Sequence, residues 1–155
     1  MALHLESVPV ASLLAEAQGL FAEVAEEQGV ALRVEGADPL AVRADRTRAL
    51  QALANLVDNA VKFTPAGGEV VLSGRRDGAT VALSVADTGI GIPAEDLPHV
   101  WERLFRGDRS RSERGLGLGL SLVKAIALAH RGDVAVESSP GNGSRFTIRL
   151  PADLA

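Results

Sequence analysis

Two asparagines and a lysine on one helical segment are the residues best suited to chemistry in this sequence. The segment NLVDNAVKF places Asn55, Asn59 and Lys62 at positions i, i+4 and i+7. Because each helical residue advances by about 100°, these three side chains share one stripe. Asparagine is a poor helix former, since its amide competes for backbone hydrogen bonds. Amide oxygens suit Mg²⁺ that is bound together with phosphates, and an ammonium group binds a phosphate oxygen.

A solvated helix face is the simpler interpretation of the same stripe. Arg48 and Gln51 extend the stripe toward the N-terminus, while the other side of the segment is apolar: Leu50, Leu53, Leu56, Val57, Ala60 and Val61. A solvated face normally carries charged side chains rather than two asparagines. The stripe therefore indicates a metal–phosphate site only if other motifs support it.

A glycine turn, DTGIGIP, follows directly on the alternating segment VALSV. Gly89 and Gly91 allow the backbone to come close to a flat ligand. A fixed carboxylate at Asp87 can accept a hydrogen bond from an exocyclic amine such as that of adenine. The alternative is an Asx-type turn that caps a short helix after Pro93.

A second glycine motif, GLGLGL, precedes a helical pattern with glycines at 115, 117 and 119. Backbone N–H groups and the helix dipole at such a start favour an anion. Leu120 stands where a dinucleotide fingerprint needs its third glycine, and neither lysine of the chain follows a glycine, as a Walker-type loop requires. By itself the motif is also compatible with a flexible entry to a helix.

The composition sets limits on the class of protein. The chain has 155 residues, 46% hydrophobic and 23% charged, which suits one globular domain with a proper core. A net charge of −4 argues against wholesale nucleic-acid binding, and the absence of cysteine excludes disulfides and thiolate metal sites. No apolar run approaches the roughly 18 residues of a membrane span, and the N-terminus lacks signal-peptide features. We expect a cytoplasmic domain that makes no membrane contact, whether or not its parent protein is anchored.

Periodicity predicts the elements that position these motifs. Helices are expected over Pro9–Gln28, from an N-cap at Asp45 to about Thr64, and over 117–130. Strands are expected at 30–35, in a short segment before Asp45, in a hairpin around Asp77–Gly78 and in a closing hairpin around Pro140–Gly143. This order predicts an α/β two-layer sandwich: three long helices on one face of a mixed, mainly antiparallel sheet. The chain is expected to form one domain, 1–155, with a leading linker at 1–7.

The three motifs occur in one order, with an arginine-rich stretch before the last. Together they resemble the ATP-binding catalytic domain of sensor histidine kinases, in the superfamily shared with DNA gyrase, the heat-shock chaperone ATPases and the mismatch-repair ATPases. The resemblance extends from about Val8 to Pro151. It implies a Bergerat-type ATP-binding fold, ATP and Mg²⁺ as cofactors, and protein-histidine kinase activity in a bacterial two-component system.

The resemblance also implies roles for individual residues. Asn59 would hold Mg²⁺, with Asn55 beside the phosphates and Lys62 on a phosphate oxygen. Asp87 would bind the adenine amino group, and two glycines would shape its pocket: Gly89 and Gly91. The second glycine motif would bind phosphate along Gly115, Gly117, Leu118 and Gly119.

The segment VWERLFR matches the family's phenylalanine box in position but departs from it. Trp101 and Leu104 stand where the family favours Phe, so we expect the loop anchor to survive with altered packing. Arg106 would reach the terminal phosphate, and residues 107–114 would form the ATP lid. Arg131 replaces a usual glycine.

In this superfamily, one sequence position distinguishes the members that hydrolyse ATP from those that transfer its phosphoryl group to a partner. The hydrolases carry Glu at the position of Asn55, where it activates water. Asn55 is neutral and cannot act as a base, and Asp58 is expected about 60° away from the asparagine stripe. The sequence therefore favours transfer to another nucleophile.

The acceptor histidine is expected outside this chain, in a separate helical hairpin of the parent kinase. None of His4, His99 and His130 lies in the His-Glu context of a phosphoacceptor helix, and we interpret His130 as structural. The cognate response regulator would be an indirect partner. Two alternatives stay open: a serine kinase of the anti-sigma-factor type, and a regulatory module that binds nucleotide without catalysis.

Overall fold

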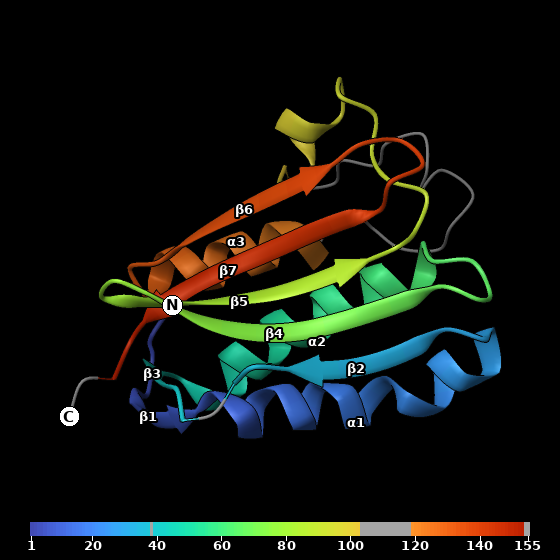
Figure 1. The fold of residues 1–155 in the computed structure, drawn as a ribbon. Helices are drawn as coiled ribbons and strands as arrows, with labels where there is room; N and C mark the ends of the chain where they lie inside the picture. Colours follow the sequence, from blue (N-terminus) through green and yellow to red (C-terminus); the bar gives the residue numbers. More distant parts are fainter. Residues whose placement is uncertain (38, 103–118, 154–155) are drawn as a thin grey trace.

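The computed structural model describes residues 1–37, 39–102 and 119–153. A five-stranded sheet with the order β2-β4-β5-β7-β6 forms one layer (Figure 1). Its strands are β2 (Ala31–Glu35), β4 (Glu69–Asp77), β5 (Thr80–Asp87), β6 (Asp133–Ser138) and β7 (Ser144–Pro151). The β2–β4 pair is parallel and the other three pairs are antiparallel. The sheet is therefore mixed and mainly antiparallel, as predicted.

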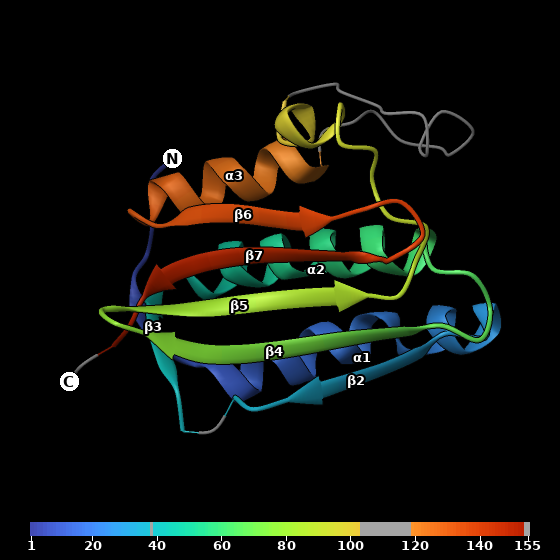
Figure 2. The ribbon, with the colours of Figure 1, turned by 45° about the horizontal axis from the view of Figure 1, so that its top comes forward.

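Three helices cover one face of this sheet in both ribbon views (Figures 1 and 2). They are α1 (Val10–Gln28), α2 (Arg46–Lys62) and α3 (Gly119–Ala129). Helix α2 lies in the middle, because it contacts both α1 and α3. The two-layer α/β sandwich with three helices on one face is confirmed.

One end of the sandwich gathers the segments that carry the motifs. The end of β5, the end of α2 and the start of α3 lie at the same side in both views, whereas the N-terminus and the end of β7 lie at the other side (Figures 1 and 2). Successive residues of a strand point to opposite faces. Asp87 therefore continues the row of Val81, Leu83 and Val85, whose side chains are at most 1% exposed.

The N-terminal segment differs from the prediction. Glu6 and Ser7, expected in a linker, belong to β1 (Glu6–Pro9), which pairs antiparallel with β3 (Ala41–Ala44) in a separate two-stranded sheet. Pro9 is the N-cap of α1 rather than its first residue. Four residues show too little alternation to predict a strand, and the partner strand that stabilises it lies about thirty residues along the chain.

The helix ends have local explanations. Helix α1 ends at Gly29, whose φ of +73° and backbone N–H bonds to Ala25 and Glu26 cap it as expected. Helix α2 ends at Lys62 instead of Thr64, because Phe63 has left helical geometry and Pro65 disfavours it further. Within the described residues, no helix is long and apolar enough to cross a membrane.

Candidate functional site

Burial of one side and a cap at its first turn determine how helix α2 presents the polar stripe. Seven residues on its inner side are buried: Ala49, Ala52, Leu53, Leu56, Val57, Ala60 and Val61. At its start, Asp45 Oδ1 accepts a hydrogen bond from the Arg48 backbone N–H at 3.1 Å. The backbone N–H groups of His4 and Arg48 hold the pKa of the Asp45 carboxyl below its usual value. The buried side thus fixes the rotation of α2 and leaves the two asparagines half-buried outside the apolar core.

The two asparagines differ in their contacts. Asn55 Nδ2 donates to the Gly119 carbonyl oxygen at 3.3 Å, so the stripe touches the first residue of α3. Asn59 Nδ2 is buried, yet it has no hydrogen-bond partner in the part of the chain that the structure describes. Buried polar atoms are nearly always paired, so an amide left over at this place is available to a ligand. The asparagine stripe therefore lies against the start of α3 at Gly119.

Lys62 forms an ion pair with Asp58. Its Nζ lies 3.1 Å from Asp58 Oδ2, one helical turn earlier, and both side chains are more than a third exposed. An exposed i,i+4 pair of this kind contributes only about 0.3–0.5 kcal/mol. The lysine can therefore exchange this carboxylate for a phosphate at little cost.

Asp87 is held rigidly at the end of β5. It is 7% exposed, and its Oδ1 accepts hydrogen bonds from the backbone N–H groups of Gly89 at 2.9 Å and Ser144 at 3.2 Å. The Asp87–Gly89 bond is the Asx-type turn that formed the simpler interpretation of DTGIGIP. Ser144 comes from β7, so the carboxylate also bridges two strands. The Asx turn alone therefore does not account for the aspartate.

Both glycines of the turn are required by close backbone approach. A Cβ on Gly89 would lie 2.2 Å from the Phe63 carbonyl oxygen, at the end of α2. A Cβ on Gly91 would lie 2.0 Å from the Ser139 carbonyl oxygen, and Gly91 has a φ of +76°. These contacts press the turn against α2 on one side and the β6–β7 loop on the other.

The β6–β7 loop is the part of the site that the sequence did not identify. The backbone N–H of Ile92 donates to Ser138 Oγ at 2.9 Å, and that of Gly141 donates to the Ile90 carbonyl oxygen at 2.8 Å. Ser138 Oγ in turn donates to the Gly143 carbonyl oxygen at 2.8 Å. The segment SSPGNGS predicts a hairpin turn, but no local signal shows that it braces Asp87.

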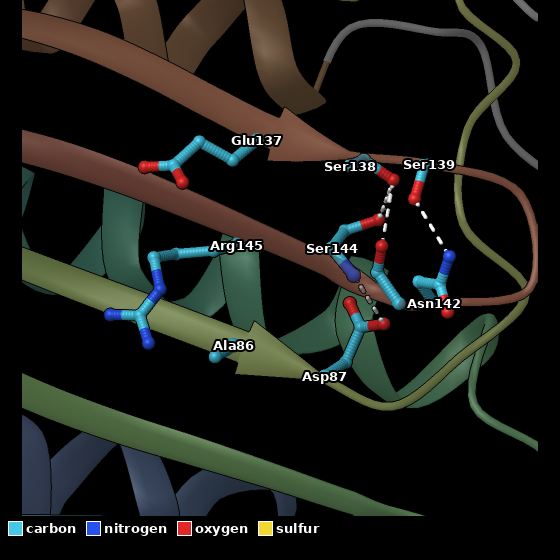
Figure 3. A pocket seen from close by; sticks show the side chains of 9 residues that line it. Ala86, Asp87, Glu137, Ser138, Ser139, Asn142, Ser144 and Arg145 are labelled. Atoms are coloured by element: carbon cyan, nitrogen blue, oxygen red, sulfur yellow. Dashed lines mark hydrogen bonds between the residues drawn. The ribbon is translucent and has the colours of Figure 1, made fainter.

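A hollow of about 420 Å³ adjoins this loop (Figure 3). In the close-up, Asp87, Ser138 and Ser144 lie together where β5, β6 and β7 meet the β6–β7 loop. Glu137 and Arg145 lie one position along β6 and β7, so their side chains point to the sheet face opposite to Asp87. The hollow therefore opens toward the face without helices, while the asparagine stripe lies on the helical side.

Several predicted site residues lie outside the described residues. They are Arg106, Gly115, Gly117, Leu118, the segment 107–114 and Leu104. Gly119 is described and begins α3. Trp101 is described as well, and its ring meets Phe146 edge-to-face with centroids 5.6 Å apart. Trp101 thus packs on the apolar core.

The described part of the candidate site offers two amides, one ammonium group and one buried carboxylate: Asn55, Asn59, Lys62 and Asp87. Across 1–37, 39–102 and 119–153, no group of three or more His, Asp or Glu side chains could hold a metal ion by itself. A divalent cation here would need amide oxygens together with oxygens of a ligand. Asn59 carries such an oxygen, Oδ1, while its unpaired atom, Nδ2, is a donor that suits an oxygen of the ligand.

The profile of the family described as histidine kinase-, DNA gyrase B- and HSP90-like ATPase matches residues 44–154. The chain belongs to this family. It is 43% identical over 151 residues to the sensor-like histidine kinase SenX3 of Mycobacterium tuberculosis, covering 96% of this chain and 37% of SenX3. This family member therefore spans little more than a third of the length of that relative.

Solved structures of sensor kinases share the fold of this family member. Full-length ShkA in complex with AMPPNP superposes with a TM-score of 0.89 at 34% identity, covering all of this chain and 32% of ShkA. The catalytic domain of the histidine kinase ThkA gives a TM-score of 0.85 at 29% identity, covering 96% of this chain and 98% of that domain. ThkA has also been solved in complex with the response regulator protein TrrA.

Proposed function

We propose that this domain binds ATP with Mg²⁺ and transfers the γ-phosphoryl group to a histidine in a separate helical hairpin of its parent kinase. The observation that carries the proposal is the neutral amide of Asn55, which lies against the start of α3 at Gly119. The neighbouring carboxylate of Asp58 is paired with Lys62. Neither residue supplies a free base for activating water, which favours transfer over hydrolysis.

The positions of the side chains support a role for each of them. Asp87 accepts a hydrogen bond from the adenine amino group, in a pocket shaped by Gly89 and Gly91. Asn55 and the first backbone N–H groups of α3, from Gly119 onward, bind phosphate oxygens. Lys62 leaves Asp58 to neutralise a further phosphate charge.

Asn59 would hold Mg²⁺ through its amide oxygen, Oδ1. Amide oxygen is a neutral hard ligand, and the metal's remaining positions would be filled by phosphate oxygens and water. When bound, the cation neutralises the charge that develops on the triphosphate. The contribution of α2 is to hold the Asn59 amide on a rigid helix whose other side is buried.

The transfer step needs alignment rather than a strong base. The lone pair of a neutral imidazole nitrogen forms the new N–P bond while the bond from the γ-phosphorus to the β–γ bridging oxygen breaks and ADP leaves. The domain aligns ATP and neutralises its charge, and the partner hairpin supplies the nucleophile. A response regulator would receive the phosphoryl group afterwards, so it is an indirect partner. We further propose a cytoplasmic location and a single domain over 1–155.

Calorimetry with ATP, in the presence and absence of Mg²⁺, tests the binding part of the proposal. We expect Asn59→Ala to abolish the gain in affinity that Mg²⁺ gives, because it removes the amide oxygen that would bind the cation. Gln51→Ala, on the same stripe one turn before Asn55, is the matched control and should keep that gain. Binding that is independent of both Mg²⁺ and Asn59 would refute the assignment.

A further inference from the structure

His130 lies at the end of α3, far along the helix from Gly119, and both of its ring nitrogens are bonded. The side chain is 4% exposed. Nδ1 lies 2.8 Å from the Ile126 carbonyl oxygen, and Nε2 lies 3.0 Å from the Asp45 backbone nitrogen. A carbonyl oxygen only accepts and a backbone N–H only donates, so Nδ1 carries the proton and Nε2 carries the lone pair. The geometry therefore requires a neutral imidazole in one tautomer.

Asp45, the partner of His130, is the junction where α2 begins. Its side chain caps α2 through the Arg48 backbone N–H, while its Oδ2 accepts from the His4 backbone N–H at 3.0 Å. Its own backbone N–H has the His130 ring as its acceptor. A single residue thus ties together the N-terminal segment, the start of α2 and the end of α3.

Two hydrogen bonds join α2 to α3, and the distance between them is nearly the same along both helices. Asp45 bonds to His130 at one end, and Asn55 bonds to Gly119 at the other. The two bonds are ten residues apart on α2 and eleven on α3, or about 15 and 16.5 Å at the rise of an α-helix. Because the two helices run antiparallel, both bonds are satisfied at one relative position of the helices. A slide of α3 by one residue, about 1.5 Å, would break both.

We infer that His130 is a positioning residue, which sets the register between the start of α3 and the asparagine stripe of α2. The inference rests on the proposed function, because this register decides whether the α3 N–H groups and the Asn55 amide meet the same phosphates. His130 contacts no ligand itself. It acts through Asp45 and α2, at the end of the helix pair remote from Asn55.

Three substitutions separate this role from simple filling of space. In His130→Gln the amide oxygen reaches the place of Nε2 and accepts from the Asp45 N–H. In His130→Asn the amide reaches only the place of Nδ1, so it bonds to Ile126 but not to Asp45. His130→Leu retains apolar volume and makes neither bond. A filling role predicts that Leu is tolerated and that Gln and Asn behave alike.

The dissociation constant of Mg²⁺–ATP, measured by calorimetry on the 155-residue chain, reports whether the register of α3 on α2 is kept. We expect His130→Gln to keep the dissociation constant within about threefold of wild type. Loss of register by an ångström should weaken binding about tenfold or more in the Asn and Leu variants. Val81→Ala, a fully buried site at the far end of β5, is the stability control and should bind normally. Equal losses in all three His130 variants, or no loss in Asn and Leu, would overturn the inference.

The tautomer gives a second readout that does not depend on ATP. Two-bond ¹H–¹⁵N spectra of the imidazole rings should show His130 protonated at Nδ1 and unprotonated at Nε2 at neutral pH, in the nucleotide-free chain. The opposite tautomer or a doubly protonated ring would overturn the inference. If wild type failed to bind Mg²⁺–ATP while this tautomer was found, the proposed function would fail and the Asp45–His130 link would stand.

Discussion

Replacing Asp87 with asparagine should reverse the hydrogen-bonding character of the adenine pocket. Asp87 Oδ1 already accepts from the backbone N–H groups of Gly89 and Ser144. An asparagine at this place would keep its amide oxygen on those two donors, which turns its NH₂ group toward the ligand. The adenine amino group would then face a donor instead of an acceptor.

The magnitude follows from the bonds that change. A bond to a charged acceptor contributes about 1.5–3 kcal/mol, and a buried donor left without an acceptor costs about 1–3 kcal/mol. Together these give a loss of roughly 2.5–6 kcal/mol for ATP, or about two to four orders of magnitude in the dissociation constant. The two retained backbone bonds lose the contribution of charge, about 1 kcal/mol each, so the free energy of unfolding should fall by about 2 kcal/mol.

Calorimetry at a temperature where the variant is fully folded measures the loss of ATP affinity. Denaturant unfolding measures the fall in the free energy of unfolding. GTP provides an internal check, because its ring carries an oxygen where adenine carries the amino group. Asp87→Asn should narrow the preference for ATP over GTP, since the new NH₂ group can donate to that oxygen.

Ser84→Ala is a suitable control for Asp87→Asn. Ser84 lies on the same strand, is equally buried at 7% exposure, and loses a hydroxyl pair with Thr147 when substituted. It should lower stability without changing ATP affinity. If Asp87→Asn bound ATP within threefold of wild type, the assignment of Asp87 to adenine would be wrong.

Three further substitutions test other parts of the structure. Arg131 has a φ of +63°, so Arg131→Gly should raise the free energy of unfolding in a denaturant titration by about 1 kcal/mol. Asp58→Asn removes only the exposed pair with Lys62, so ATP affinity measured by calorimetry should change by at most about twofold. The pKa of Asp45 is lowered, first by the backbone N–H of His4, so its stabilising effect is present above the unfolded-state pKa and lost as pH falls through the folded one. Asp45→Asn should therefore flatten the loss of stability on acidification below about pH 4, as followed by thermal unfolding at several pH values.

Each of these expectations has a contrary result. A destabilised Arg131→Gly would mean that the guanidinium makes a contact worth more than the backbone strain. A tenfold change in Asp58→Asn would give that carboxylate a role at the phosphates. If Asp45→Asn lost stability on acidification as the wild type does, the ionised Asp45 carboxylate would not contribute to stability.

Local pattern was sufficient to predict the parts of the site that depend on one element. The 100° advance of a helix places Asn55, Asn59 and Lys62 on one side of α2 regardless of the rest of the fold, and burial of the apolar side confirms it. Strand alternation likewise placed Asp87 at the end of β5. Both predictions needed only the periodicity of apolar residues and the residues that end each helix or strand.

The contacts that the sequence did not predict join residues far apart in the chain. Ser144 donates to Asp87 across 57 residues, and Asp45 donates to His130 across 85 residues. Periodicity carries no information about such pairs, because they depend on strand order and helix register. For the same reason β1 was expected to be a linker, since its partner β3 decides that it is a strand.

Incubation of the isolated chain with γ-labelled ATP and Mg²⁺ is the most direct test of the central claim. We expect ATP to bind with negligible release of ADP, and no acid-labile label to appear on the chain. The reason is that the neutral Asn55 stands where a hydrolase has its base, and that the phosphoacceptor lies in a partner hairpin. Sustained ADP release, or stable acid-labile label on His4, His99 or His130, would contradict it.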